Sequence, residues 1–94
     1  MVKHIVAWQL KEGIDLPSVT AKMKEKLEGL VGKVEGLNFA EVLIDKGMGS
    51  VVLISELDSF DALKGYATHP EHVKVADTYV RPFTASRTAV DCEI

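Results

Sequence analysis

Four segments of the chain alternate between apolar and polar side chains in the way that β-strands do. In the first segment one face carries Val2, His4, Val6, Trp8 and Leu10, and the intervening face is also partly apolar. Two partly apolar faces indicate a sheet that is covered on both sides. The expected strands are residues 1–10, 37–45, 50–57 and 86–94.

A first helix is expected after the first strand. Asp15 can cap it, Pro17 is tolerated in its first turn, and Gly29 and Gly32 mark its end. Its apolar positions recur at helical spacing and comprise Val19, Met23, Leu27, Leu30 and Val31. The pattern is that of an amphipathic helix that packs one face against a sheet.

A second helix is expected after the third strand, and a proline interrupts it. Ser59 can cap this helix, and Pro70 disfavours helical geometry at the preceding His69 while suiting the first turn of a new helix. The apolar face before the break comprises Phe60, Leu63, Tyr66 and Ala67. The new helix is expected to continue to about residue 79, followed by a loop at Arg81-Pro82-Phe83.

The order of elements is strand, helix, strand, strand, helix, strand, with no linker that would divide residues 1–94 into two domains. This order predicts an α+β ferredoxin-like plait, with a four-stranded antiparallel sheet and both helices on one face. The other face would stay uncovered although it must carry Trp8 or Ile5, Phe39 or Val42, and Val52 or Leu53. We therefore expect a homodimer in which two sheets pack face to face.

Composition excludes several classes of protein. A net charge of −3 and a pI near 5.5 do not provide the basic surface that nucleic acids require, so no nucleic-acid partner is expected. No apolar run could span a membrane, and the N-terminal apolar segment turns polar too soon for a secretion signal, which predicts a cytoplasmic protein. Cys92 is the only cysteine, so neither a disulfide nor a thiolate metal site can form within one chain. The Gly47-Met48-Gly49 segment lies between two strands and indicates a hairpin turn rather than a phosphate-binding loop.

The candidate chemistry is concentrated in the segment Tyr66-Ala67-Thr68-His69-Pro70-Glu71-His72. His72 falls in the first turn of the new helix, where the positive end of the helix dipole disfavours a protonated imidazole. A neutral His72 could remove a proton next to a carbonyl while Tyr66 stabilises the resulting enolate. The structural alternative is that Tyr66 fills core space and that backbone groups satisfy both histidines.

Other residues complete the predicted site. His4, inside the first strand, is a third catalytic candidate, although a hydrogen-bonded structural role would also explain it. Trp8, His69 and Arg81 are predicted to bind substrate, and Arg81 could orient a carboxylate or simply form an exposed ion pair. His69 and His72 lack the fixed geometry of a metal-binding helical turn, so we expect no metal and no cofactor.

Three segments together resemble the stress-responsive α/β-barrel domain (Dabb) family over nearly the whole chain. They are Val2-Lys3-His4, the Tyr66-x-x-His69-Pro70-x-His72 break, and the closing Val90-Asp91-x-Glu93. The resemblance implies a dimeric α+β barrel, which agrees with the arrangement predicted from the pattern of strands and helices. It does not specify a function, and a monooxygenase on the same plait is suggested by analogy of fold alone.

The family includes a plant polyketide cyclase, olivetolic acid cyclase, and the resemblance implies that its acid/base pair corresponds to Tyr66 and His72. Its early-strand histidine corresponds to His4, whereas this chain has Val51 where that cyclase has a further pocket histidine. The family also contains a boiling-resistant plant protein that forms a ring. Two functions are therefore expected: acid/base chemistry of a cyclase or lyase type on a small carbonyl compound, or non-enzymatic, stress-related binding or assembly.

Overall fold

The structure of the protein is a computed structural model that describes residues 1–94. Its elements are β1 (Val2–Leu10), α1 (Leu16–Glu28), β2 (Leu37–Ile44), β3 (Ser50–Leu57), α2 (Phe60–Thr68), α3 (Pro70–Val75), a π-helical turn (Ala76–Val80), a 3₁₀ turn (Arg81–Phe83) and β4 (Thr84–Glu93). The sequence predicted each strand to within two residues at either end. No helix is both long enough and apolar enough to cross a membrane.

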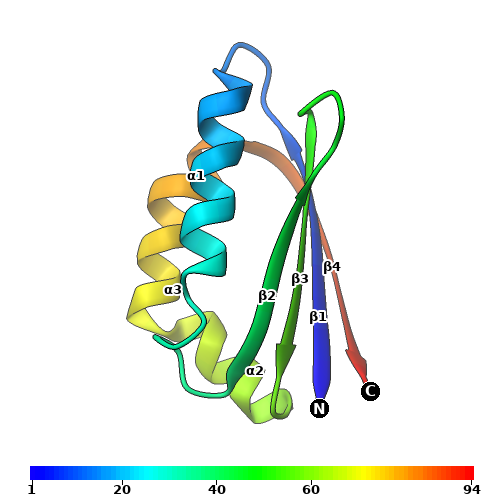
Figure 1. The fold of residues 1–94 in the computed structure, drawn as a ribbon, viewed down its shortest axis with the longest axis vertical. Helices are drawn as coiled ribbons and strands as arrows, with labels where there is room; N and C mark the ends of the chain where they lie inside the picture. The colour runs from blue at the N-terminus through cyan, green and yellow to red at the C-terminus, as the bar shows by residue number, and fades with distance from the viewer.

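The four strands form one antiparallel sheet in the order β2-β3-β1-β4. The helices lie together on one side of this sheet, and the other side is left open (Figure 1). This is the predicted ferredoxin-like plait. The two central strands are β1 and β3, and the two edge strands are β2 and β4. Because β1 pairs with β4, the N-terminal residues lie beside the C-terminal ones.

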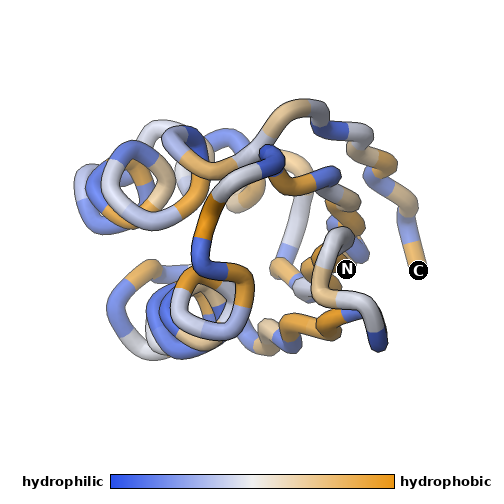
Figure 2. The backbone as a smooth tube through the Cα atoms, turned by 90° about the horizontal axis from the view of Figure 1, so that it is seen from above, coloured by the Kyte–Doolittle hydropathy of each residue, from blue (hydrophilic) through white to orange (hydrophobic).

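The core lies between the sheet and the helices. Alternate residues of β1 and β3 point into it, because Val6 pairs with Leu53 and both are 1–2% exposed. The helices supply the opposing side chains, including the buried Met23 and Leu27 of α1. Figure 2 shows the helices on one side of the molecule and the strands, rich in hydrophobic residues, on the other.

The register resolves which apolar residues face away from the helices. Ile5 and Val52 alternate with buried neighbours and lie on the open face, whereas Trp8 and Leu53 are in the core. Four large apolar side chains on the open face or at its edge are 41–59% exposed, namely Phe39, Leu43, Val90 and Ile94. An exposed apolar set on one sheet face is typical of an interaction surface.

The edge strand β4 reverses the usual arrangement of polar and apolar faces. Its register places Arg87 opposite Trp8 and Asp91 opposite His4, so these two charged residues are on the helix side of the sheet. The intervening Val90 faces the open side beside Ile5. Every residue of β4 after Thr84 is exposed, so the positions on its helix side need not be apolar.

The helix boundaries have local causes. Ser59 caps α2 as predicted, since its hydroxyl accepts a hydrogen bond of 3.1 Å from the Ala62 N–H. Asp15 occupies the cap position of α1, but the expected side-chain bond is not formed. Phe60, which the sequence placed on the apolar face of this helix, lies at the first helical position, and its side chain is 44% exposed. The predicted hairpin turn is present, with the Met48 N–H bound to the Asp45 carbonyl at 2.8 Å.

The free edge of β2 is closed by two side chains of α1. Glu28 accepts a hydrogen bond of 2.8 Å from the Val42 N–H, and Lys24 donates one of 2.8 Å to the Val42 carbonyl. The two side chains also bind each other at 2.7 Å. Burial would raise the pKa of the Glu28 carboxyl, but the hydrogen bonds from Lys24 and Val42 and the charge of Lys24 outweigh it and lower that pKa.

Candidate active site

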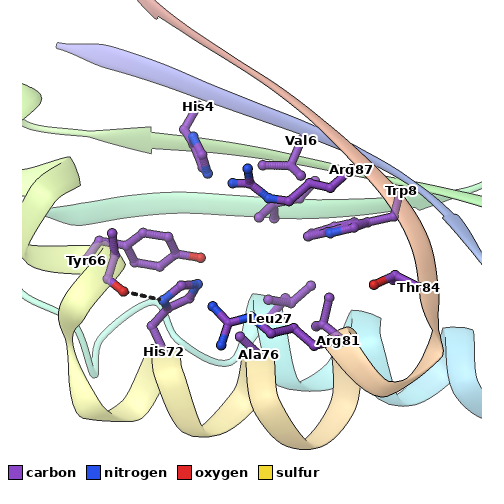
Figure 3. Close-up of a pocket in the computed structure, with 13 residues that line it drawn as sticks. His4, Val6, Trp8, Leu27, Tyr66, His72, Ala76, Arg81, Thr84 and Arg87 are labelled. Atoms are coloured by element: carbon purple, nitrogen blue, oxygen red, sulfur yellow. Dashed lines mark hydrogen bonds between the residues drawn. The ribbon is translucent and has the colours of Figure 1, made fainter.

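A pocket of about 370 Å³ lies between the sheet and the helices, within the range of small-molecule sites. Eight of its 13 lining residues are hydrophobic, so a ligand would meet apolar contacts together with a few polar groups there. Five of the six residues that the sequence singled out line this pocket: His4, Trp8, Tyr66, His72 and Arg81. They come from β1, α2, α3 and the 3₁₀ turn, and meet only because the plait brings these elements together (Figure 3).

His72 is held in one tautomer by the backbone. Its Nδ1 lies 3.2 Å from the Ala67 carbonyl oxygen, across the break made by Pro70. A carbonyl can only accept a hydrogen bond, so Nδ1 carries the proton and Nε2 of the neutral ring has a free lone pair. Burial lowers the pKa of His72; the bond to Ala67 opposes this, and the charges of Arg81, His4 and Arg87 add to it. His72 is therefore neutral at physiological pH and can act as a base.

Tyr66 lies directly against this base. The two ring centroids are 4.2 Å apart with an interplanar angle of 36°. Only 3% of Tyr66 is exposed, and its hydroxyl points into the pocket (Figure 3). Burial raises the pKa of Tyr66 to about 12, although the charge of Arg87 acts in the opposite direction. The phenol consequently keeps its proton and can donate a hydrogen bond to a developing oxyanion.

His4 faces the same pocket from the sheet. It is 7% exposed, and its ring stands edge-on to Tyr66 at a centroid distance of 6.1 Å. Its Nδ1 is bonded to the carboxylate of Asp91 on the neighbouring strand. The pairing joins a partly exposed carboxylate of the edge strand to a buried histidine. This carboxylate fixes the orientation of the His4 ring.

Arg81 and Arg87 bring positive charge to the pocket from opposite sides. Arg81 follows the π-helical turn and is paired with Asp77 one turn earlier, and Arg87 enters from β4 (Figure 3). Sequence reasoning missed Arg87. Arg87 lies in a strand whose side chains point alternately to the two faces of the sheet. That it shares a face with Trp8 is set by the pairing of β4 with β1, at opposite ends of the chain.

The π-helical turn explains how α3 ends at the pocket. Ala76 and Val80 are buried within it and line the cavity, and Arg81 directly follows. A π turn adds a residue to a helical turn and re-aims the side chains that come after it, and such turns are frequent at functional sites. The sequence predicted helix over this segment, but its hydrogen-bond pattern was not foreseen.

His69 does not share this pocket. Its Nδ1 accepts a hydrogen bond of 3.1 Å from the Glu71 N–H and so caps α3, which is the structural alternative considered for it. It lines a separate, more open hollow together with Asp58 and Asp61. The two histidines of the break therefore face different hollows, and no three His, Cys, Asp or Glu side chains are grouped as metal ligands.

The fold and the pocket define a ferredoxin-like α+β domain whose cavity holds the Tyr66 phenol against the His72 imidazole. Residues 2–94 match the family described as Stress Responsive A/B Barrel Domain, or Dabb, and the chain belongs to that family. An uncharacterized protein of Streptomyces coelicolor is 35% identical over 78 residues, which cover 77% of this chain and 79% of the relative.

Two solved structures are similar over almost the entire chain. A dimeric ferredoxin-like protein of unknown function from Bacteroides fragilis has 34% identity and a TM-score of 0.88, with 99% of this chain and 95% of that one covered. A dimeric ferredoxin-like protein of unknown function from Thermobifida fusca has 21% identity and a TM-score of 0.85, with 99% and 90% covered. The second likeness shows the fold alone, and both agree with the predicted plait.

Proposed function

We propose that this protein is a cofactor-free enzyme that moves protons on a small carbonyl compound. The observation that carries the proposal is the placement of two complementary groups in one pocket lined mostly by hydrophobic residues: the free Nε2 of His72 and the protonated hydroxyl of Tyr66, on rings whose centroids are 4.2 Å apart. A base, an oxyanion donor and a water-poor cavity are what proton abstraction beside a carbonyl requires.

The reaction begins when His72 Nε2 takes a proton from the carbon next to the carbonyl. The electron pair of the broken C–H bond forms a C=C bond, and the carbonyl π pair moves onto oxygen. Tyr66 donates a hydrogen bond to that oxygen, and His72 can later return its proton to the same or another atom, as cyclase- or lyase-type chemistry requires. His4, held by Asp91, lies beside Tyr66 and completes the polar side of the pocket.

Exchange of carbon-bound hydrogen tests this function. Acetylacetone or another ketone in deuterium oxide should exchange its acidic hydrogens faster with the protein than in buffer, followed by proton NMR. His72→Ala should lower the exchange rate by about 10²–10⁴-fold, the usual effect of losing a general base. His69→Ala is the matched control, since that histidine is outside the pocket. Equal rates for the protein and His72→Ala across a panel of ketones would refute the proposed chemistry.

We further infer that the chain is a homodimer joined through the open sheet face. The exposed Phe39, Leu43 and Val90 support this, because monomers seldom leave such side chains together in water. The similar proteins from B. fragilis and T. fusca are described as dimeric. A face-to-face dimer would cover the open faces and leave the pocket on the opposite side of each sheet. A cytoplasmic location stays a prediction.

A non-enzymatic binding or assembly protein is the second candidate, and the same apolar face favours it. An assembly protein would use this face and a further external surface, and its pocket would have no catalytic task. The exchange experiment distinguishes the two functions. A dimer that accelerates no exchange would favour assembly, whereas acceleration that depends on His72 would favour the enzyme.

A further inference from the structure

The chain contains two arginines, and both line the candidate active site. Nine lysines make up the rest of its 11 basic side chains, and none of them lines this pocket. Arginine presents a planar fork of N–H donors that matches the two oxygens of a carboxylate. Placing both arginines at one cavity of an acidic protein indicates that the cavity is arranged to receive an anion.

Arg87 is the arginine that is free to do this. The structure contains four ion pairs, and none involves Arg87. Arg81 is already paired with Asp77, and the other nearby carboxylate, Asp91, is paired with His4. The carboxylates beside the pocket are therefore engaged, and the positive charge of Arg87 lacks a partner within the chain.

The two guanidinium groups also influence the catalytic pair. Figure 3 shows Arg87 reaching in from the sheet and Arg81 from the helix side, with the Tyr66 hydroxyl and His72 ring beyond their ends. The charges of both arginines lower the pKa of His72, and that of Arg87 also acts on Tyr66. An anion bound to Arg87 would therefore lie within the same cavity as the base and the oxyanion donor.

We propose that the carbonyl compound taken by this pocket carries a carboxylate, and that Arg87 binds this carboxylate with Arg81 in support. This inference rests on the proposed function, since it names the substrate class for the same site. The guanidinium groups would orient the substrate so that its acidic C–H bond faces His72 Nε2. They would also stabilise the second negative charge that enolate formation places on an already anionic molecule.

Binding can be measured separately from catalysis because Trp8, the only tryptophan, lines the pocket and reports on it by fluorescence. The probes are levulinate, a keto acid, and levulinamide, its neutral analogue. Levulinate should bind about tenfold or more tightly than levulinamide, as expected for a charge-assisted pair. Arg87→Gln should abolish this preference, Arg87→Lys should restore it in part, and Lys46→Gln, which removes one charge from the hairpin turn, should leave it unchanged.

The outcomes separate this inference from the proposed function. Equal binding of the two probes, or no binding of levulinate, would overturn the carboxylate assignment even if neutral ketones exchange their hydrogens. A carboxylate preference that survives in Arg87→Gln would overturn the role of Arg87. Inorganic phosphate that displaces levulinate and binds more tightly would show that the pocket selects a phosphate instead. His72→Ala should keep the preference and lose only the exchange.

Discussion

The His72 imidazole packs against the Tyr66 phenol at 4.2 Å, while its Nδ1 is bonded to the carbonyl of Ala67. The contact exists because Pro70 stops α2 and restarts the chain as α3, which turns the histidine back over the preceding helix. One backbone break thus sets the tautomer of the imidazole and its position beside the phenol.

The protonation of His72 should make folding sensitive to mild acid. Its pKa is lowered in the folded protein, chiefly by burial, so between that value and about 6.5 the unfolded chain binds more protons than the folded one. Stability should consequently fall as the pH drops through this window. Urea unfolding at about pH 7.5 and about pH 5 should show a smaller acid loss in His72→Gln than in the unmodified protein. An identical loss in both proteins would contradict the assignment.

Tyr66 should stay protonated well into the alkaline range. Burial raises its pKa from 10.0 to about 12, so the folded protein binds the extra proton and loses this stability as the pH rises through that interval. In Tyr79→Phe, Tyr66 is the only tyrosine, and its near-ultraviolet absorbance should change only close to the upper value. Ionisation near 10 in the folded variant would show that the hydroxyl is accessible to water.

Tyr66→Phe should slow hydrogen exchange from a bound ketone by about 10²–10³-fold, the effect of losing one oxyanion donor. The ring is retained, so its packing against His72 should be preserved and the unfolding midpoint should change little. Proton NMR and thermal unfolding measure the two effects. A full exchange rate in this variant would remove Tyr66 from the mechanism, and a large loss of stability would favour the structural role.

Trp8→Ala should destabilise the protein by about 3–5 kcal/mol, as is usual when a buried aromatic side chain is removed. Trp8 is 6% exposed and belongs to the core cluster on the helix side of β1. Phe60→Ala is the control, because Phe60 is 44% exposed and should contribute far less. Equilibrium urea unfolding compares the variants, and equal effects would show that the Trp8 site collapses without cost.

Val90→Lys should weaken the proposed dimer. Val90 is 51% exposed on the open face, where a lysine would place a charge in a sheet-to-sheet interface. Val31→Lys is the control, since Val31 is 40% exposed but lies beyond α1, away from the sheet face. Sedimentation equilibrium should show dissociation only in the first variant. A monomer in the unmodified protein would remove the interface altogether.

Glu28→Ala should cost about 1 kcal/mol, because the Val42 N–H and Lys24 would lose a charged acceptor. The lowered pKa of Glu28 means that this contribution is present at neutral pH and is lost as the pH falls through that pKa. Glu25→Ala removes a carboxylate that binds only Lys22, and both of those side chains are more than half exposed. Its effect on urea unfolding should be close to zero.

Local patterns were sufficient to predict most of the fold. Alternation in Ser50–Leu57 gave both ends of β3, and the proline after His69 gave the break that creates the pair of Tyr66 and His72. The ferredoxin-like plait then followed from the succession of strands and helices. These predictions succeeded because their causes are short-range, namely the side-chain period of a strand and the steric effect of proline.

The features of the site that could not be predicted from the sequence depend on contacts between distant segments. Arg87 and Asp91 could be placed on one face of β4, but their neighbours Trp8 and His4 are decided by the register with β1. The sequence could not distinguish the roles of His69 and His72 either, since each side chain could form a hydrogen bond with a backbone group. Only the packed structure shows that His69 caps α3 while His72 faces the pocket.

Two side chains of α1 bind the backbone of Val42 on the edge strand β2, and this limits how the sheet can extend into larger assemblies. A sheet grows sideways by offering unpaired N–H and C=O groups to another chain, and here Lys24 and Glu28 have already taken those of Val42. The opposite margin, β4, has no comparable cover among the hydrogen bonds of the structure. Strand-by-strand fibre growth would therefore stall at one border, and loss of the Lys24–Glu28 clamp would open a second growing end.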